Sequence, residues 1–284
     1  MKLPQQKRSK TRPVRSGAEE QVRQIYRKLA SAWGPQHWWP AETPFEVIAG
    51  AILAQNTSWA NVERAMANLR SAGLLTIEEI RNVSLDKLES LVRPSGYFRQ
   101  KAQRLKDLVG FIDAKHGGSV EQMLATPTDE LRAELLAQKG IGPETADSIL
   151  LYAGLHPVFV VDAYTRRIFE RHQVVSASAK YDDIRLLVQQ ALAAEDSPLA
   201  VANDAARPIV HSPSAMSTAQ QSQHARVYNE MHGLLVQVGK HYCRKQQPLC
   251  DLCALGELLS SEQRARLRSF ARNRKKPRTG RTGN

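Results

Sequence analysis

Apolar side chains recur along most of this chain at the three- and four-residue spacing that places them on one face of an α-helix. In the segment 19–33, for example, Val22, Ile25 and Leu29 fall on one side. The apolar run 158–161 is too short to build a sheet, and no longer segment alternates as a strand does. The pattern therefore predicts an all-α protein, with helices over 19–33, 45–53, 59–71, 77–82, 85–93, 99–116, 128–137, 143–155, 162–171 and 225–241.

Local signals mark some of the helix boundaries. Thr76 and Ser84 stand where N-caps belong, and Glu79 follows Thr76 at the spacing of a capping box. The segment 194–224 has no such organisation, because it is rich in Ala, Ser, Gln and Pro and holds no long periodic stretch. We predict a loop or a disordered insertion there.

Basic residues are concentrated at the two ends of the chain. The net charge is +12, yet residues 1–16 carry six Lys or Arg and residues 263–284 carry nine, with no acid in either segment. The residues between them are close to neutral. We predict two basic disordered arms, which favour a polyanionic partner, most simply nucleic acid. Solvated tails that improve solubility are the alternative.

The composition is that of an ordinary globular protein, with 42% hydrophobic and 24% charged residues. No stretch approaches about 18 consecutive apolar residues and no secretory leader is recognisable, so we expect a cytoplasmic protein without a membrane span. The three cysteines all lie between positions 243 and 253. An odd, clustered set argues against a disulfide framework and for a metal site or a reduced compartment.

The segment 135–167 holds the strongest motif. Gly140 and Gly142 flank Ile141 between two predicted helices, and glycines allow a tight turn that a ligand can approach closely. The second helix begins at Pro143, which leaves its unpaired N–H groups as an anion site. This arrangement can hold a DNA phosphate without reading sequence. An ordinary glycine-capped turn between two helices would have the same sequence.

An acid, Asp162, follows this second helix at the end of the apolar run 158–161. An aspartate at the start of a helix is commonly an N-cap. The hairpin, the helix and the Val-Val-Asp sequence together resemble the helix-hairpin-helix superfamily of DNA glycosylases, typified by endonuclease III. Three more segments resemble the same family, namely 45–57, 95–102 and 243–253. The resemblance covers roughly residues 20–190 and 225–255.

The resemblance implies a fold of two helical lobes with a DNA-binding cleft between them. One lobe would be the six-helix segment 42–156. The other would combine residues 17–41 with residues 157–262. The hairpin and Asp162 would then lie at the cleft.

The resemblance also implies roles for single residues. Asp162 would be the catalytic carboxylate, because a carboxylate stabilises the oxocarbenium charge on the sugar and can orient water. The target base must be flipped out of the duplex, and Gln55 matches the position that fills the gap. A cap at a helix end is the alternative for Gln55. The residues that would bind DNA phosphate are Gly140, Gly142 and Thr145.

One departure from endonuclease III bears directly on the chemistry. Bifunctional members carry a lysine in the hairpin motif whose amine attacks the sugar, whereas this chain has Glu144 there. A carboxylate cannot form a Schiff base, and neither Lys139 nor Lys101 occupies the motif position. We therefore predict a monofunctional glycosylase that leaves an abasic site. Tyr164 stands where the family has a histidine, and the sequence offers no reason.

Three of the four tryptophans, Trp38, Trp39 and Trp59, lie close together in the sequence. The string 38–57 resembles the 3-methyladenine glycosylase branch of the superfamily, and Glu144 fits that branch too. Alkylated purines of this kind are cationic and leave easily, and a cation stacks well on aromatic faces. We predict that the indoles stack on the damaged base. Packing in the core or between the lobes is the alternative.

The cysteines Cys243, Cys250 and Cys253 have the spacing of the first three ligands in the family's iron–sulfur loop. A [4Fe–4S] cluster takes four thiolates, but the fourth position holds Leu259. The sequence is compatible with a cluster that has a non-cysteine ligand, with a three-iron or labile cluster, or with a loop without metal. Zinc on the three cysteines and His241 is a further alternative.

The leading hypothesis is a monofunctional glycosylase for alkylated purines, acting as a nucleoid-associated monomer on double-stranded DNA that contains damaged bases. A glycosylase and lyase like endonuclease III, acting on oxidised pyrimidines, is a second hypothesis that Glu144 disfavours. A non-catalytic DNA-binding protein is the third, because an N-cap aspartate would look the same there.

Overall fold

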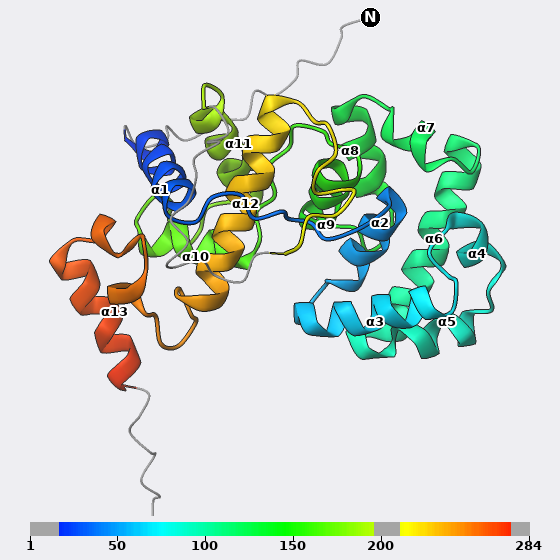
Figure 1. Ribbon diagram of the computed structural model, residues 1–284, viewed down its shortest axis with the longest axis horizontal. Helices are drawn as coiled ribbons and strands as arrows, with labels where there is room; N and C mark the ends of the chain where they lie inside the picture. Colours follow the sequence, from blue (N-terminus) through cyan, green and yellow to red (C-terminus); the bar gives the residue numbers. More distant parts are fainter. Residues whose placement is uncertain (1–16, 196–210, 274–284) are drawn as a thin grey trace, which may run out of the picture.

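The computed structural model describes residues 17–195 and 211–273, and these ranges are built from helices and connecting loops without any strand (Figure 1). The predicted all-α class is confirmed. The elements are, in chain order, α1 (Ala18–Trp33), α2 (Pro44–Leu53), α3 (Trp59–Ser71), α4 (Ile77–Asn82), α5 (Leu85–Val92), η1 (Arg93–Ser95), α6 (Phe98–His116), α7 (Val120–Leu124), α8 (Thr128–Ala137), α9 (Pro143–Ser148), η2 (Ile149–Ala153), α10 (Ala163–Arg171), α11 (Tyr181–Leu192), α12 (Gln223–His241), η4 (Cys250–Leu252), η5 (Gly256–Leu258) and α13 (Ser261–Asn273).

The helices form two groups that lie side by side in Figure 1. In the first group, α1 packs against α11 and α12, and α10 packs against α12. In the second group, α2 packs on α3 and α6, while α4 and α5 cover α6 and α8 packs on α9. The π-helical segment η2 continues α9 and contacts both α2 and α12. It therefore joins the two groups, as the expected two-lobed fold requires.

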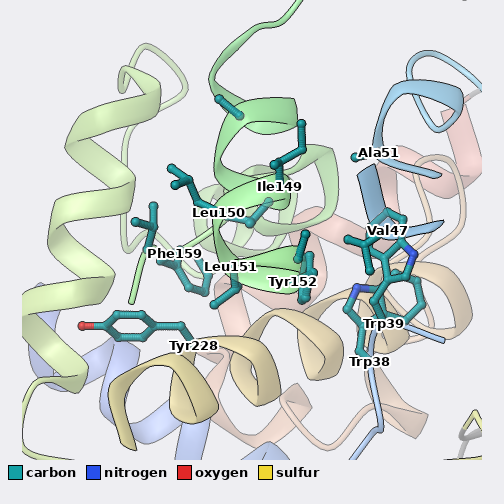
Figure 2. Packing of buried hydrophobic residues seen from close by; sticks show 14 of the residues in the cluster. Trp38, Trp39, Val47, Ala51, Ile149, Leu150, Leu151, Tyr152, Phe159 and Tyr228 are labelled. Atoms are coloured by element: carbon teal, nitrogen blue, oxygen red, sulfur yellow. The ribbon is translucent and has the colours of Figure 1, made fainter. Parts of the chain in front are cut away.

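The apolar core is continuous across this junction. Figure 2 shows Leu150 and Tyr152 of η2 between Phe159 and Tyr228 on one side and Trp39 on the other. Tyr152 and Phe159 are 2% and 0% exposed. Burying one large apolar side chain stabilises a fold by roughly 1.5–3 kcal/mol. This packing fixes the buried run 158–161, so the residue that follows it, Asp162, has a defined position.

Local capping sets several helix ends as predicted. The Thr76 side chain accepts a hydrogen bond from Glu79 N and the Glu79 carboxylate accepts one from Thr76 N, which completes the capping box of α4. Ser84 caps α5 by accepting from Lys87 N. Each cap satisfies N–H groups that the first helical turn leaves unpaired.

The predicted disordered tail 263–284 is wrong for residues 263–273, which belong to helix α13. Ser260 and Gln263 bond reciprocally, with Gln263 N donating to Ser260 Oγ at 3.1 Å and Ser260 N donating to Gln263 Oε1 at 2.6 Å. Leu267 is 9% exposed and anchors the helix against the first group. A cap and one apolar anchor thus order a segment whose charge alone suggested disorder.

The segment 194–224 was predicted to be a loop or a disordered insertion, and its described residues 211–222 form a loop with a turn over 215–218. Helix α12 begins at Gln223. Met216 N donates to Ala41 O at 3.1 Å, and Ala41 N donates to the Ser214 hydroxyl at 3.2 Å. These bonds join residues that are far apart in the sequence. The composition of the segment itself therefore does not indicate them.

Besides α13, two α-helices were not predicted. Helix α7 is only one turn and a fraction long. Helix α11 buries Ile184, Leu187, Val188 and Ala191 at helical spacing, so its signal is present in the sequence. The expectations for residues 1–16, 196–210 and 274–284 lie outside the described residues. Within the described ranges, no helix combines the length and apolar character needed to cross a membrane.

Candidate active site and nucleic-acid interface

Asp162 stands at the N-terminus of α10. Its Oδ1 accepts a hydrogen bond from Thr165 N at 2.7 Å, so the carboxylate caps the helix. Its Oδ2 points elsewhere and lies 3.7 Å from Nε2 of His232. The side chain is 12% exposed. The N-cap and the candidate catalytic group are therefore the same carboxylate, with one oxygen engaged by the helix.

The hairpin has the backbone that its glycines suggest. Gly140 has a φ of +84°, which side chains rarely allow, and Gly142 is the extended N-cap residue of α9. A Cβ on Gly140 would lie 2.2 Å from Nε of Arg104, so a side chain there would also displace this arginine. Ile141 between the glycines is buried. The turn is thus fixed by one apolar anchor and by the close approach of an arginine.

Gln55 fastens the end of α2 to this hairpin. Its Nε2 donates to Gly140 O at 3.0 Å and to Thr145 Oγ1 at 2.9 Å, and Arg104 donates to its Oε1. The structure therefore brings together Gln55, Gly140 and Thr145, which the sequence connected only through resemblance, along with Arg104, which was not predicted. To enter a duplex, the Gln55 side chain would have to exchange these bonds for contacts with DNA.

The three predicted tryptophans form one aromatic cluster. The ring centroids of Trp59 lie 5.0 Å from Trp38 and 4.9 Å from Trp39, and His211 lies 5.2 Å from Trp38. Trp38 and Trp39 are each 7% exposed, whereas Trp59 on α3 is half-buried. A Cβ on Gly50 would lie 3.1 Å from the Trp39 ring, so Trp39 packs tightly on α2. Trp39 has the character of a core residue, and Trp59 is the more accessible of the two indoles.

Glu144, the second residue of α9, is placed near Asp162. Although the residue is exposed as a whole, its carboxyl is surrounded by protein atoms, and this burial raises the pKa of Glu144 to about 7. The negative charge of Asp162 acts in the same direction, and Arg166 opposes it. The motif position therefore presents an acid that takes up a proton near neutral pH, not an amine.

The two lysines near the motif, Lys101 and Lys139, have different surroundings. Lys101 is 1% exposed, and its Nζ donates to Leu53 O at 2.8 Å and Ser95 O at 2.6 Å. Burial lowers the pKa of Lys101 to about 8. It caps the end of α2 and ties it to the chain before α6. Lys139 is exposed, on the approach to the hairpin.

Comparison with known proteins identifies the family. The sequence profile of the HhH-GPD superfamily, described as base excision DNA repair proteins, matches residues 49–194. A protein of Methanocaldococcus jannaschii, provisionally named a DNA repair glycosylase, is 42% identical over 245 residues, which are 86% of this chain and 97% of that protein. This chain belongs to the HhH-GPD superfamily of DNA repair glycosylases.

Two solved structures are similar to this HhH-GPD protein in fold. The 3-methyladenine DNA glycosylase MagIII of H. pylori, bound to 1,N6-ethenoadenine, is 30% identical with a TM-score of 0.60, covering 78% of this chain and 97% of MagIII. An endonuclease III trapped covalently on DNA is 21% identical with a TM-score of 0.64, covering 88% and 99%. The second likeness is one of fold alone.

Tyr164, for which the sequence offered no role, packs between two helices. A Cβ on Gly239 would lie 2.2 Å from the Tyr164 ring, so the glycine makes room for it between α10 and α12. The Arg167 guanidinium lies 5.0 Å from the centre of the same ring. Tyr164 therefore joins two helices of the first group.

The three cysteines of this HhH-GPD protein line one cavity. Nη1 of Arg171 lies 3.2 Å from the Cys243 sulfur. Burial raises the pKa of Cys253 to about 11 and also raises that of Cys250, which favours the protonated thiol at both positions. The remaining lining residues are Arg171, His172, Val238, Tyr242, Gly256, Leu259 and Leu267.

This cavity fits part of an iron–sulfur site. Leu259, in the place of the fourth cysteine, is 5% exposed and turns an apolar side chain toward the three thiols. Within the described ranges, no three Cys, His, Asp or Glu side chains converge closely enough for a single metal ion, and His241 is not among the lining residues. The geometry of the described residues thus disfavours zinc on three cysteines and His241, while the three thiols share one cavity.

Two polar residues close to Asp162 were not predicted from the sequence. His232 on α12 is 4% exposed, and its Nδ1 lies 2.5 Å from the hydroxyl of Tyr152 on η2. The available signal was a histidine inside the long apolar face of α12. A buried histidine in such a face is commonly structural, so only the fold connects it with the site.

Proposed function

We propose that this protein is a monofunctional DNA glycosylase that hydrolyses the N-glycosidic bond of flipped-out alkylated purines, such as 3-methyladenine, in double-stranded DNA. The observation that carries the proposal is that Glu144, a carboxyl group whose pKa the charge of Asp162 raises, occupies the hairpin position where the lyase needs an amine. The likeness to MagIII, a 3-methyladenine DNA glycosylase, supports the substrate class.

In this mechanism the bond from the sugar C1′ to the purine nitrogen breaks, and its electron pair leaves with the base. An alkylated purine is already cationic, so it departs neutral without strong acid assistance. The Asp162 carboxylate stabilises the positive sugar, and a water molecule adds to C1′ and gives up a proton. The product is an abasic site with an intact strand, because Glu144 cannot form a Schiff base.

The hairpin and Gln55 would hold the DNA. The N–H groups at the start of α9 and the backbone of Gly140 and Gly142 can bind phosphate without base readout. Flipping the base out of the duplex costs a few kcal/mol. Insertion of Gln55 into the vacated space and stacking of the base on the indoles can offset about this amount. The interlocked Gln55, Arg104 and Thr145 contacts support a role at this interface.

The test of the proposal is incubation of the full-length protein with a panel of duplexes, each with one lesion, analysed before and after alkali. We expect strand breaks only after alkali, with 3-methyladenine duplexes and not with oxidised pyrimidines. Breaks before alkali on oxidised pyrimidines would support the lyase. Binding without any base release would support the non-catalytic protein.

Trp59 is the indole we expect to stack on the base. Replacing Trp59 with Ala should slow 3-methyladenine release by about 5- to 150-fold, the equivalent of roughly 1–3 kcal/mol for one stacking face. Trp59→Phe should keep most of the rate, because an aromatic face remains. Single-turnover rates and melting curves check both variants.

Trp39→Ala is the matched control, since Trp39 packs on Gly50. It should mainly lower the free energy of unfolding, by about 3–5 kcal/mol for a core aromatic residue. A folded Trp59→Ala protein with the wild-type rate would show that the whole cluster is scaffold.

We also propose that Cys243, Cys250 and Cys253 hold an iron–sulfur cluster whose fourth corner lacks a cysteine. Such a cluster would act as a structural crosslink between the end of α12 and the loop before α13. Protein purified without oxygen should show visible absorbance, with stoichiometric iron and acid-labile sulfide. Cys250→Ser should lose both, and His241→Ala should lose neither. Stoichiometric zinc, or a metal-free wild type that melts like Cys250→Ser, would refute the site.

A further inference from the structure

A buried chain of polar groups leads from the aromatic cluster to Asp162. The Tyr152 ring lies 5.3 Å from the Trp39 ring, and the Tyr152 hydroxyl lies 2.5 Å from Nδ1 of His232. Nε2 of His232, on the opposite side of the imidazole, lies 3.7 Å from Oδ2 of Asp162. The chain thus connects η2, α12 and the start of α10.

The donor and acceptor roles along this chain follow from burial. Burial raises the pKa of Tyr152 well above its ordinary range, so its hydroxyl keeps its proton and can donate to Nδ1. Burial lowers the pKa of His232, and the charge of Asp162 acts against that effect. A neutral imidazole that accepts at Nδ1 carries its proton on Nε2, the atom that faces Asp162.

The N–H at Nε2 of His232 has no other acceptor in the described part of the chain. Among the described residues Nε2 of His232 is buried and has no hydrogen-bond partner. A buried donor without a partner is costly, typically about 1–3 kcal/mol. The nearest carboxylate oxygen is Oδ2 of Asp162, because Oδ1 already accepts from Thr165 N. Catalytic hydrogen bonds are often long in free enzymes and shorten in the substrate complex.

We propose that His232 is a positioning residue for Asp162: it donates from Nε2 to Oδ2 as a neutral imidazole, in a tautomer fixed by Tyr152. This inference rests on the proposed catalytic role of Asp162. With Thr165 N on one oxygen and His232 on the other, the plane of the carboxylate is fixed once the 3.7 Å contact from Nε2 shortens in the substrate complex.

A neutral partner suits this reaction better than a cation. The carboxylate must keep its negative charge to stabilise the sugar cation, and a lysine or imidazolium in contact with it would cancel much of that charge. An N–H of a neutral ring orients the carboxylate and leaves its charge in place. The rings of Tyr152 and Phe159, at 5.8 and 6.3 Å, hold the imidazole between them.

The test uses full-length variants and two separate measurements, the single-turnover rate of 3-methyladenine release and the Kd for duplex DNA. His232→Ala should lower the rate by about 10- to 100-fold, as loss of an orienting partner typically does, and leave the Kd within about 2-fold. His232→Gln, which keeps an uncharged N–H donor, should recover most of the rate. His224→Ala, an exposed histidine on the same helix, should match wild type.

A spectroscopic measurement distinguishes positioning from packing. In protein with 15N-labelled histidine, we expect the His232 signals of a neutral ring protonated at Nε2. Tyr152→Phe, which keeps the ring and removes the donor, should mix the two tautomers and slow base release. The 15N spectra of the wild type and of Tyr152→Phe test the inference even if His232→Ala does not fold.

The inference is overturned by a folded His232→Ala protein with the wild-type rate, by a His232→Gln protein that is no faster than the alanine variant, or by an Nδ1-protonated or charged His232. Asp162→Asn is measured in parallel. If Asp162→Asn is inactive and His232→Ala is normal, only this inference fails. If Asp162→Asn remains active, the proposed function fails with it.

Discussion

Asp162→Asn is expected to lower the single-turnover rate of 3-methyladenine release by about 10²- to 10⁴-fold, the range in which a positioned acid–base group contributes. The substituted amide has nearly the same shape but no charge, so it cannot stabilise the sugar cation. Asparagine is as good an N-cap as aspartate, and its oxygen can still accept from Thr165 N. The fold and the DNA affinity should therefore be preserved.

The measurements are rate, DNA Kd and melting temperature on the same preparation. Asp162→Ala serves as the control for the cap, because it removes both the charge and the acceptor. It should be inactive and also less stable, by about 1 kcal/mol. An Asp162→Asn protein that excises at the wild-type rate would return Asp162 to a purely structural role.

Borohydride is expected to trap no covalent DNA adduct with the wild-type protein, and to trap one with Glu144→Lys. The variant places an amine at the start of α9 near Asp162, in surroundings that raise the pKa of the native carboxyl to about 7. The same surroundings would favour the uncharged, nucleophilic form of a lysine through burial, although Asp162 would oppose this. The expected change is from no detectable adduct to a measurable fraction of the DNA.

Glu144→Gln is the matched control, because it removes the charge without adding an amine. It should trap nothing and leave strands intact. Efficient trapping by the wild type would mean that another amine, such as Lys139, reaches the sugar, and the monofunctional mechanism would be wrong. Glu144→Lys without any adduct would mean that the start of α9 lies too far from C1′.

The sequence by itself determined those parts of the molecule whose causes are local. The helices 59–71, 77–82 and 128–137 end where predicted, because apolar periodicity and nearby caps such as Thr76 act over a few residues. The hairpin was determined equally locally, since Gly140 adopts a backbone that other residues rarely tolerate. Motif spacing was enough to identify Asp162 as the candidate catalytic residue, although its catalytic role stays a prediction.

Local composition did not indicate the distant partners that hold two segments. The residues 211–222 are held by Ala41 through Ser214 and Met216, and α13 is held by Leu267. Neither polarity nor charge density in a segment reports such contacts. They depend on which surface the rest of the chain presents.

Only the tertiary structure decided the surroundings of the site. Tyr152 and His232 are separated by 80 positions, and they meet because η2 and α12 pack against each other. Packing against Gly50 of α2 buries Trp39, whereas Trp59 is only half-buried, although the sequence treats the two alike. Periodicity specifies which face of a helix is buried, but not which neighbour buries it. The polar partners of Asp162 therefore follow from long-range packing, which no local pattern contains.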